Sequence, residues 1–281
     1  MVRLRALFAA ALALALVPPA ASGALPARMV MPWMCLEDCG FSKAQIAAQL
    51  QQLATPGLFT DASFEDYDLS PAGLVTKFSA RSRVSGDVAA LGLGSHAMVV
   101  SWLTNSTRAA LADPQAFVES VIAQILDVEG ANVTALNLDF EPNGAANPPG
   151  PEPTPADAAA YAAFLDVVAD AMHARGVKVG VDIATWSPFW DYSLLNATRV
   201  DWLFDMESYQ APQAGFEKAV AHAQQFVSPE KYVCGLETHP FNATELAQRF
   251  AFLSARNVRR VAVWSSPMPA EWIPYLAAVG T

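Results

Sequence analysis

The stretch Leu136-Asn137-Leu138-Asp139-Phe140-Glu141-Pro142 alternates apolar and polar side chains, ends on two carboxylates and is stopped by a proline. Successive side chains of a β-strand point to opposite faces, so the pattern predicts a strand with Asn137, Asp139 and Glu141 in one row. The stretch lies between two helix-like segments, where a strand is normally buried on both faces. Buried carboxylates about 6 to 7 Å apart along a strand cost free energy unless they are paired or used. We interpret the row as part of a functional site in which Asn137 binds substrate beside the two carboxylates, with a structural ion-pair network as the alternative.

The rest of the chain alternates short apolar runs with helical patterns. We predict eight strands, at residues 28–34, 57–65, 97–102, 134–141, 177–186, 201–209, 231–237 and 260–265. Helical segments follow them, most clearly at 43–54, 113–128 and 155–175, with a less defined one within 70–93. Eight strand–helix pairs in this order predict an α/β fold, a closed (β/α)8 TIM barrel that forms a single domain over residues 24–281.

The N-terminus has the features of an export signal. Arg3 and Arg5 precede an apolar run over residues 6–17, and two prolines and small residues follow. This pattern predicts a signal peptide over residues 1–23, because the run is too short to span a membrane. Four of the eight asparagines begin a glycosylation sequon, Asn105, Asn132, Asn196 and Asn242. We expect a secreted or lysosomal protein that is glycosylated at Asn105, Asn196 and Asn242.

Charge and cysteine content limit the partners. The formal net charge of −10 disfavours nucleic acid and anionic membranes, and we expect a soluble monomer. Cys35 and Cys39 flank a tight loop and could form a disulfide, whereas Cys234 lies in a strand-like run and is expected to be a buried small hydrophobe. No histidine is near these cysteines in sequence, so we predict no metal site from them and no cofactor.

The functional face of such a barrel is where the strands end. If the apolar residues of each strand face the helices, strand parity turns acids and aromatics toward the barrel mouth. We add Trp33, which lies near the end of the first strand. The residues that we predict at the barrel mouth are Trp33, Glu65, Asp182, Trp186, Glu207, Tyr209, Glu237 and Trp264. Sugar rings stack on aromatics and their hydroxyls bond to carboxylates, so this mixture favours a carbohydrate partner. Glycoside cleavage also needs a protonated acid, and apolar walls beside Glu141 and Asp139 would raise the pKa of Glu141 as required.

Residues 137–141 resemble the D-G-x-D-x-D-x-E signature of the family 18 glycoside hydrolases, which include chitinases, chitobiases and endo-β-N-acetylglucosaminidases. The resemblance implies a (β/α)8 barrel in which Glu141 is the general acid/base and Asp139 orients the 2-acetamido group of the substrate. It also implies that the acetamido oxygen, rather than an enzyme carboxylate, is the nucleophile. Tyr209 would hydrogen-bond the acetamido group, and Trp264 would form the floor of the −1 subsite.

The sequence departs from this signature at several points. Asn137 stands where the family has the first aspartate of a proton-sharing row; an amide can still hydrogen-bond Asp139 but cannot take its charge or its proton. Thr134-Ala135 replaces the opening Asp-Gly, and the third strand lacks the family's S-x-G-G. On the sixth strand, Met206 and Tyr209 are one residue further apart than in the family's M-x-Y-D. By strand parity they cannot both face inward, so we place Trp202, Phe204 and Met206 outside and Tyr209 inside with Glu207.

Several functions remain open at this point. The first is a retaining hydrolase of glycans that contain N-acetylglucosamine, using Glu141 and Asp139 without a metal. The second is an inactive chitinase-like lectin, which the retained Glu141 disfavours. The third is a metal-dependent phosphodiester hydrolase that binds Ca²⁺ or Mg²⁺ through the acids of the mouth, for which only His239 is near as a base. A glycosidase that uses two carboxylates directly is the fourth.

Overall fold

The computed structural model describes residues 27–36, 41–77, 84–145, 149–264 and 267–281. The predicted signal peptide, residues 1–23, lies outside the described residues, as does Cys39. Cys35 is part of a disulfide, and Cys234 is free and buried, as expected. No helix in the described ranges is long and apolar enough to cross a membrane.

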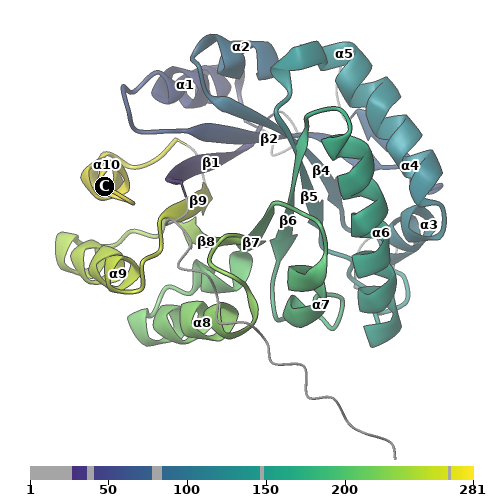
Figure 1. The fold of residues 1–281 in the computed structure, drawn as a ribbon. Coiled ribbons are helices and arrows are strands. Elements are labelled where there is room, and N and C mark those ends of the chain that lie inside the picture. The colour runs from purple at the N-terminus through teal and green to yellow at the C-terminus, as the bar shows by residue number, and fades with distance from the viewer. Residues whose placement is uncertain (1–26, 37–40, 78–83, 146–148, 265–266) are drawn as a thin grey trace, which may run out of the picture.

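Eight parallel strands form a closed barrel with helices around it (Figure 1). The barrel closes because β1 pairs in parallel with both β9 and β2. The strands are β1 (Met29–Cys35), β2 (Asp61–Leu69), β4 (Gly94–Ser101), β5 (Ala135–Phe140), β6 (Lys178–Ile183), β7 (Trp202–Asp205), β8 (Tyr232–Glu237) and β9 (Arg260–Trp264). The predicted (β/α)8 TIM barrel is therefore confirmed.

The larger helices follow the strands and cover the outside of the barrel. They are α1 (Lys43–Leu53), α2 (Val84–Ala90), α3 (Thr104–Ala112), α4 (Pro114–Val121), α6 (Pro155–His173), α7 (Tyr192–Ala197), α8 (Gln213–Phe226), α9 (Ala243–Ala255) and α10 (Ile273–Ala277). Sequence signals set their starts: Ser42 caps α1 in a capping box, and Pro155 occupies the first turn of α6 after Thr154.

Three predicted segments have different bounds in the structure. The second strand begins four residues later than predicted, at Asp61, because Gly57 adopts a positive φ of 68° in a turn before it. Residues 70–93 contain the antiparallel strand β3 (Val75–Lys77), which pairs with β2, as well as α2. The helix predicted at 113–128 continues beyond α4 as a π-helical turn, η1 (Ile122–Leu126), and the short α5 (Asp127–Glu129).

The barrel interior below the mouth is filled by side chains. Trp202 and Phe204 of β7 pack there with methionines and small residues of the other strands. Sequence parity had placed both residues on the outside, which is wrong. At the lower end, buried His96 stacks on Trp202 at a ring distance of 5.2 Å, and its Nε2 lies 3.0 Å from Asp61 Oδ1. The interior between the two ends of the barrel is therefore a packed core.

An aromatic cluster supports β5 from the outside. Phe140 is fully buried, and its ring lies 6.2 Å from Phe117, 5.8 Å from Tyr161 and 6.1 Å from Phe164. Tyr161 in turn stacks on Phe189 at 4.5 Å. The strand that carries Asp139 and Glu141 is therefore fixed by packing on its outer face.

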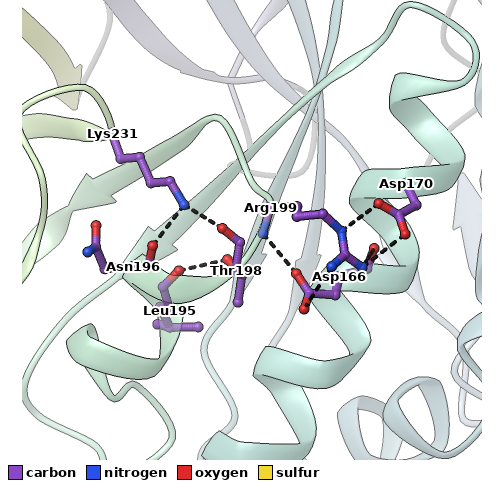
Figure 2. Close-up of polar contacts among 7 residues, drawn as sticks. All are labelled: Asp166, Asp170, Leu195, Asn196, Thr198, Arg199 and Lys231. Carbon is purple, nitrogen blue, oxygen red and sulfur yellow. Dashed lines mark hydrogen bonds and ion pairs between the residues drawn. The ribbon is translucent and has the colours of Figure 1, made fainter. Parts of the chain in front are cut away.

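Polar contacts organise the opposite end of the barrel, where β7 and β8 begin (Figure 2). Lys231 Nζ donates to the carbonyl oxygens of Asn196 and Thr198, at 2.8 and 2.5 Å. Arg199 pairs with Asp166 and Asp170 of α6, both on the protein surface. Exposed pairs of this kind contribute little free energy, so we assign them a role in loop placement.

The four sequons differ in their surroundings. Asn105, Asn132 and Asn242 are exposed. Asn196 is only partly exposed, and its Oδ1 accepts a hydrogen bond from the backbone N–H of Ser228 at 2.9 Å. Two other sequon amides also form hydrogen bonds: Asn132 Nδ2 donates to the carbonyl of Glu129 at 3.2 Å, and Asn242 Oδ1 accepts from the backbone N–H groups of Thr244 and Glu245.

Candidate active site

A cavity of about 470 Å³ opens at the carboxyl ends of the strands. Its walls combine carboxylates and aromatic rings: Trp33, Glu65, Met98, Trp102, Asp139, Glu141, Asp182, Trp186, Met206, Tyr209 and Trp264. Larger hollows of about 600 and 580 Å³ lie by α9 and α10 and beside Trp186. Neither contains a pair of carboxylates, so we assign the site to the cavity at the barrel mouth.

Glu141 lies at the rim, directly after β5. Its backbone N–H donates to the carbonyl of Ser101 at 2.8 Å, which extends the pairing of β5 with β4 by one residue. The pKa of Glu141 is raised to about 7. Burial causes the rise, and a hydrogen bond with Asp139 offsets a smaller part of it. A carboxyl group of this kind is substantially protonated near neutral pH and can act as an acid.

Asp139 lies one step deeper in the same row. Burial raises its pKa well above the ordinary value, and the neighbouring charges of Asp182, Glu141 and Glu65 raise it further. Its Oδ1 is buried without a hydrogen-bond partner among the described residues. Four acids thus surround one end of the cavity, and they cannot all be ionised together at low cost.

Asn137 lies beneath the cavity and does not line it. It is fully buried, its Nδ2 donates to Asp182 Oδ2 at 2.9 Å, and its Oδ1 accepts from Ser63 Oγ at 3.3 Å. We had expected this amide to bond to Asp139 and to bind substrate. The amide instead contacts the neighbouring strand, because Asp182 of β6 is within its reach.

Met206 and Tyr209 both line the cavity, which corrects the parity argument. β7 ends at Asp205, and residues Met206–Tyr209 form a 3₁₀ turn, η3. Residues three apart in a 3₁₀ turn share a face, whereas in a strand they would oppose each other. The turn is held by Ser208 Oγ, which donates to the carbonyls of Asp205 at 2.6 Å and Gly235 at 2.7 Å.

Gly235 on β8 gives η3 the space it needs. A Cβ at this position would lie 2.4 Å from the carbonyl oxygen of Asp205 and 2.9 Å from the ring of Tyr209. The glycine is therefore required for the close approach of the turn to β8. Burial and then the charges of the neighbouring acids keep the pKa of Tyr209 well above its ordinary value, so its hydroxyl remains a donor.

Four tryptophans border the cavity. Trp33 is buried and packs edge-on against Tyr209 at a ring distance of 5.9 Å, and Trp264 is partly buried. Trp102 and Trp186 are 46% and 54% exposed, unusually high fractions for this residue. Sequence reasoning missed Trp102, Met98 and Met206; Trp102 ends a predicted strand and could have been found by the rule used for the others.

Two predicted acids lie beside the cavity without lining it. Glu207 accepts from the backbone N–H of Thr185 at 3.2 Å. Glu237 Oε2 lies 3.0 Å from His239 Nε2, and the same nitrogen lies 3.0 Å from the carbonyl oxygen of Tyr209. In the described ranges, no group of three or more His, Cys, Asp or Glu side chains is arranged to hold a metal ion.

Comparison with known proteins relates the fold to that of chitinases. No protein-family model and no curated protein matches the sequence. Similar solved structures include a chitinase from Chromobacterium violaceum, with 14% identity over 89% of this chain and 98% of that one and a TM-score of 0.67. The Bacillus megaterium spore cortex-lytic enzyme SleL has 12% identity over 93% and 76% of the chains, with a TM-score of 0.73. The Group IV chitinase of Ostrinia furnacalis has 12% identity over 90% and 98%, with a TM-score of 0.69. The chain thus shares the chitinase fold at low sequence identity, as the resemblance implied.

Proposed function

We propose that this protein hydrolyses β-linked glycans that contain N-acetylglucosamine, with retention of configuration. The observation that carries the proposal is Glu141, an acid with a pKa of about 7 at the rim of a cavity lined by tryptophans and further acids. The structures with this fold include chitinases and a spore cortex-lytic enzyme, which supports a glycoside-hydrolase function.

In this mechanism Glu141 donates its proton to the glycosidic oxygen, and that oxygen leaves with the aglycone. The carbonyl oxygen of the 2-acetamido group attacks the anomeric carbon, so no bond to the enzyme forms. Asp139 accepts the acetamido N–H and stabilises the positive charge that develops, while Tyr209 donates to the acetamido oxygen. The ionised Glu141 then takes a proton from water, and the water oxygen bonds to the anomeric carbon. The bond from that carbon to the acetamido oxygen breaks, which restores the acetamido group, and Glu141 is again an acid.

The direct test is hydrolysis of chito-oligosaccharides and N-glycopeptides by the purified protein, with and without EDTA. We expect turnover that EDTA does not change. Binding of these glycans without turnover would favour the lectin, and turnover that EDTA abolishes would favour the metal-dependent hydrolase. Trapping of a glycosyl group on an enzyme carboxylate would favour the two-carboxylate glycosidase.

The pH dependence of kcat tests the role of Glu141. The acid form is the active one and its pKa is raised to about 7, so kcat should fall as pH rises through about 7. An ordinary glutamic acid would lose this activity near pH 4.5. A profile measured from pH 4 to 9 distinguishes the two, and a rate that rises steadily to pH 9 would contradict the assignment.

Trp186→Ala should weaken glycan binding more than it slows the reaction. The side chain is 54% exposed at the rim, so its loss removes a stacking surface and little core packing. A loss of about 1 kcal/mol corresponds to an increase of roughly fivefold in KM. Leu91→Ala, at an exposed position away from the cavity, is the control and should leave KM unchanged. An unchanged KM in the Trp186 variant would remove this residue from the binding surface.

We also propose that the protein enters the secretory pathway and carries N-glycans on Asn105 and Asn242. Both side chains are exposed. Asn196 remains a candidate, although its side chain is only partly exposed. Expression in eukaryotic cells and treatment of the medium fraction with an N-glycan-removing amidase would show a mass shift, which Asn242→Gln should reduce.

A further inference from the structure

Asp182 on β6 lies next to Asp139 in the barrel interior. β5 and β6 pair in parallel, with Asn137 opposite Gly180 and Leu138 opposite Val181. One residue further in this register, Asp139 lies beside Asp182, on strands about 4.8 Å apart. Both side chains reach the cavity. The two carboxyl groups are therefore neighbours across the sheet.

The hydrogen bonds leave one oxygen of each carboxyl group without a partner, because Asp139 bonds to Glu141 and Asp182 bonds to Asn137. Asp182 Oδ2 accepts from Asn137 Nδ2, whose orientation is fixed by Ser63 Oγ on β2. Asp182 Oδ1 and Asp139 Oδ1 are both buried, and neither has a partner among the described residues. Two buried acceptors left without donors are costly, and a proton held by the pair would supply the missing donor.

The groups that face this pair are acids, phenols and neutral side chains. They are Glu65 from β2, Asn137 and Glu141 from the β5 row and Tyr209 from η3, while Tyr161 of α6 is near the pair on the outer face of the sheet. No hydrogen bond or ion pair joins Asp139 or Asp182 to a cation of the described residues. Burial raises the pKa of Asp182 well above its ordinary value, Asn137 lowers it, and the charge of Glu141 raises it again.

We propose that Asp182 is the second carboxyl group of a proton-sharing pair with Asp139, supplied by β6 because β5 carries Asn137 in its own row. The inference rests on the proposed glycoside hydrolysis and names a further residue for it. Asp182 acts through Asp139, so it is a positioning residue and not a substrate-binding one.

The pair holds one proton throughout the reaction. With the proton on Asp182, Asp139 is ionised and accepts the acetamido N–H of the substrate. Asp139 stays ionised while the positively charged acetamido intermediate exists. When the product has left, the O–H bond on Asp182 breaks and one forms on Asp139, so the free enzyme holds the proton between the two carboxyl groups. No proton enters or leaves the pair, so the charge balance of the reaction is unchanged.

The test exchanges acid and amide between the two strands. Asp182→Asn keeps the shape and the acceptor for Asn137 but removes the second acid, and we expect kcat to fall about 10- to 100-fold with KM changed less than threefold. The double variant Asn137→Asp/Asp182→Asn returns the second carboxyl group to β5, and its kcat should be at least tenfold higher than that of Asp182→Asn. Asp127→Asn, at an exposed position, is the matched control. An unchanged kcat in Asp182→Asn, or a double variant no better than the single one, would overturn the proposal.

A second measurement does not depend on activity. In a Glu141→Gln background, infrared spectroscopy should detect a protonated buried carboxyl group that titrates above the ordinary aspartate range. Removing either partner, by Asp139→Asn or Asp182→Asn, should lower that midpoint because the like charge is gone. Midpoints that do not move would reject the pair even in an active enzyme. A wild-type protein that cleaves no glycan but shows the shift would reject the proposed function and keep the pair.

Discussion

Glu141→Gln is expected to lower kcat/KM on chito-oligosaccharides by about 10²- to 10⁴-fold, the usual contribution of a positioned general acid. Glutamine has the size of glutamate and can hydrogen-bond Asp139, but it has no proton to give to the leaving oxygen. The loss should appear in kcat, since the tryptophans that bind the sugar rings are unchanged. Steady-state rates on a chromogenic chito-oligosaccharide measure it directly.

Glu119→Gln is the matched control, because Glu119 is exposed on α4 and away from the cavity. It should retain wild-type rates, and equal rates for Glu141→Gln and wild type would contradict the assignment.

The stability of the Glu141→Gln variant provides a further check. A raised pKa means that the folded state binds a proton more tightly than the unfolded one, so stability from Glu141 is lost as pH rises from about 4.5 through about 7. The glutamine variant stays neutral, and its melting temperature should exceed that of wild type at pH 8 but not at pH 4.

Phe140→Ala is expected to reduce the free energy of unfolding by about 3 to 5 kcal/mol. The ring is fully buried and contacts Phe117, Tyr161 and Phe164, so its removal leaves a cavity among rigid aromatic neighbours. At about 2 to 4 °C per kcal/mol, the melting temperature should fall by roughly 6 to 20 °C. Chemical denaturation with urea, followed by tryptophan fluorescence, measures the same change.

The same substitution at Phe226 is the control, because that ring is 40% exposed on α8. It should cost less than about 1 kcal/mol. Equal losses for the two variants would mean that the aromatic cluster behind β5 does not support the strand in the way we describe.

Much of the fold could be predicted because its signals are local. Strand β5 was found from its alternation, and α1 and α6 from the residues that cap them. The errors occurred where local patterns change within a few residues. Gly57 delays the start of β2. Residues 70–93 contain an antiparallel strand that is too short for a periodic sequence pattern to predict it.

The candidate site was predicted less completely. Strand parity brought Glu65, Asp182, Trp186 and Trp264 to the mouth, and the structure places all four in the cavity wall. Parity failed after Asp205, because η3 replaces the strand and turns Met206 inward beside Tyr209. It also placed Trp202 and Phe204 outside, since large apolar residues suit either side of a closed barrel.

The sequence by itself determined the barrel and the row of Asn137, Asp139 and Glu141, because both follow from the period of a strand and the order of elements. Only the tertiary structure decided what each member of the row contacts. Asn137 bonds to Asp182 on the next strand, and Gly235 opens the space in which η3 brings Tyr209 to the cavity. Asn137 and Asp182 are 45 positions apart in the sequence, and Tyr209 and Gly235 are 26 positions apart, so each contact forms only when the strands of the barrel come together. Packing between the strands fixes these contacts, and no local pattern in the sequence predicts this packing.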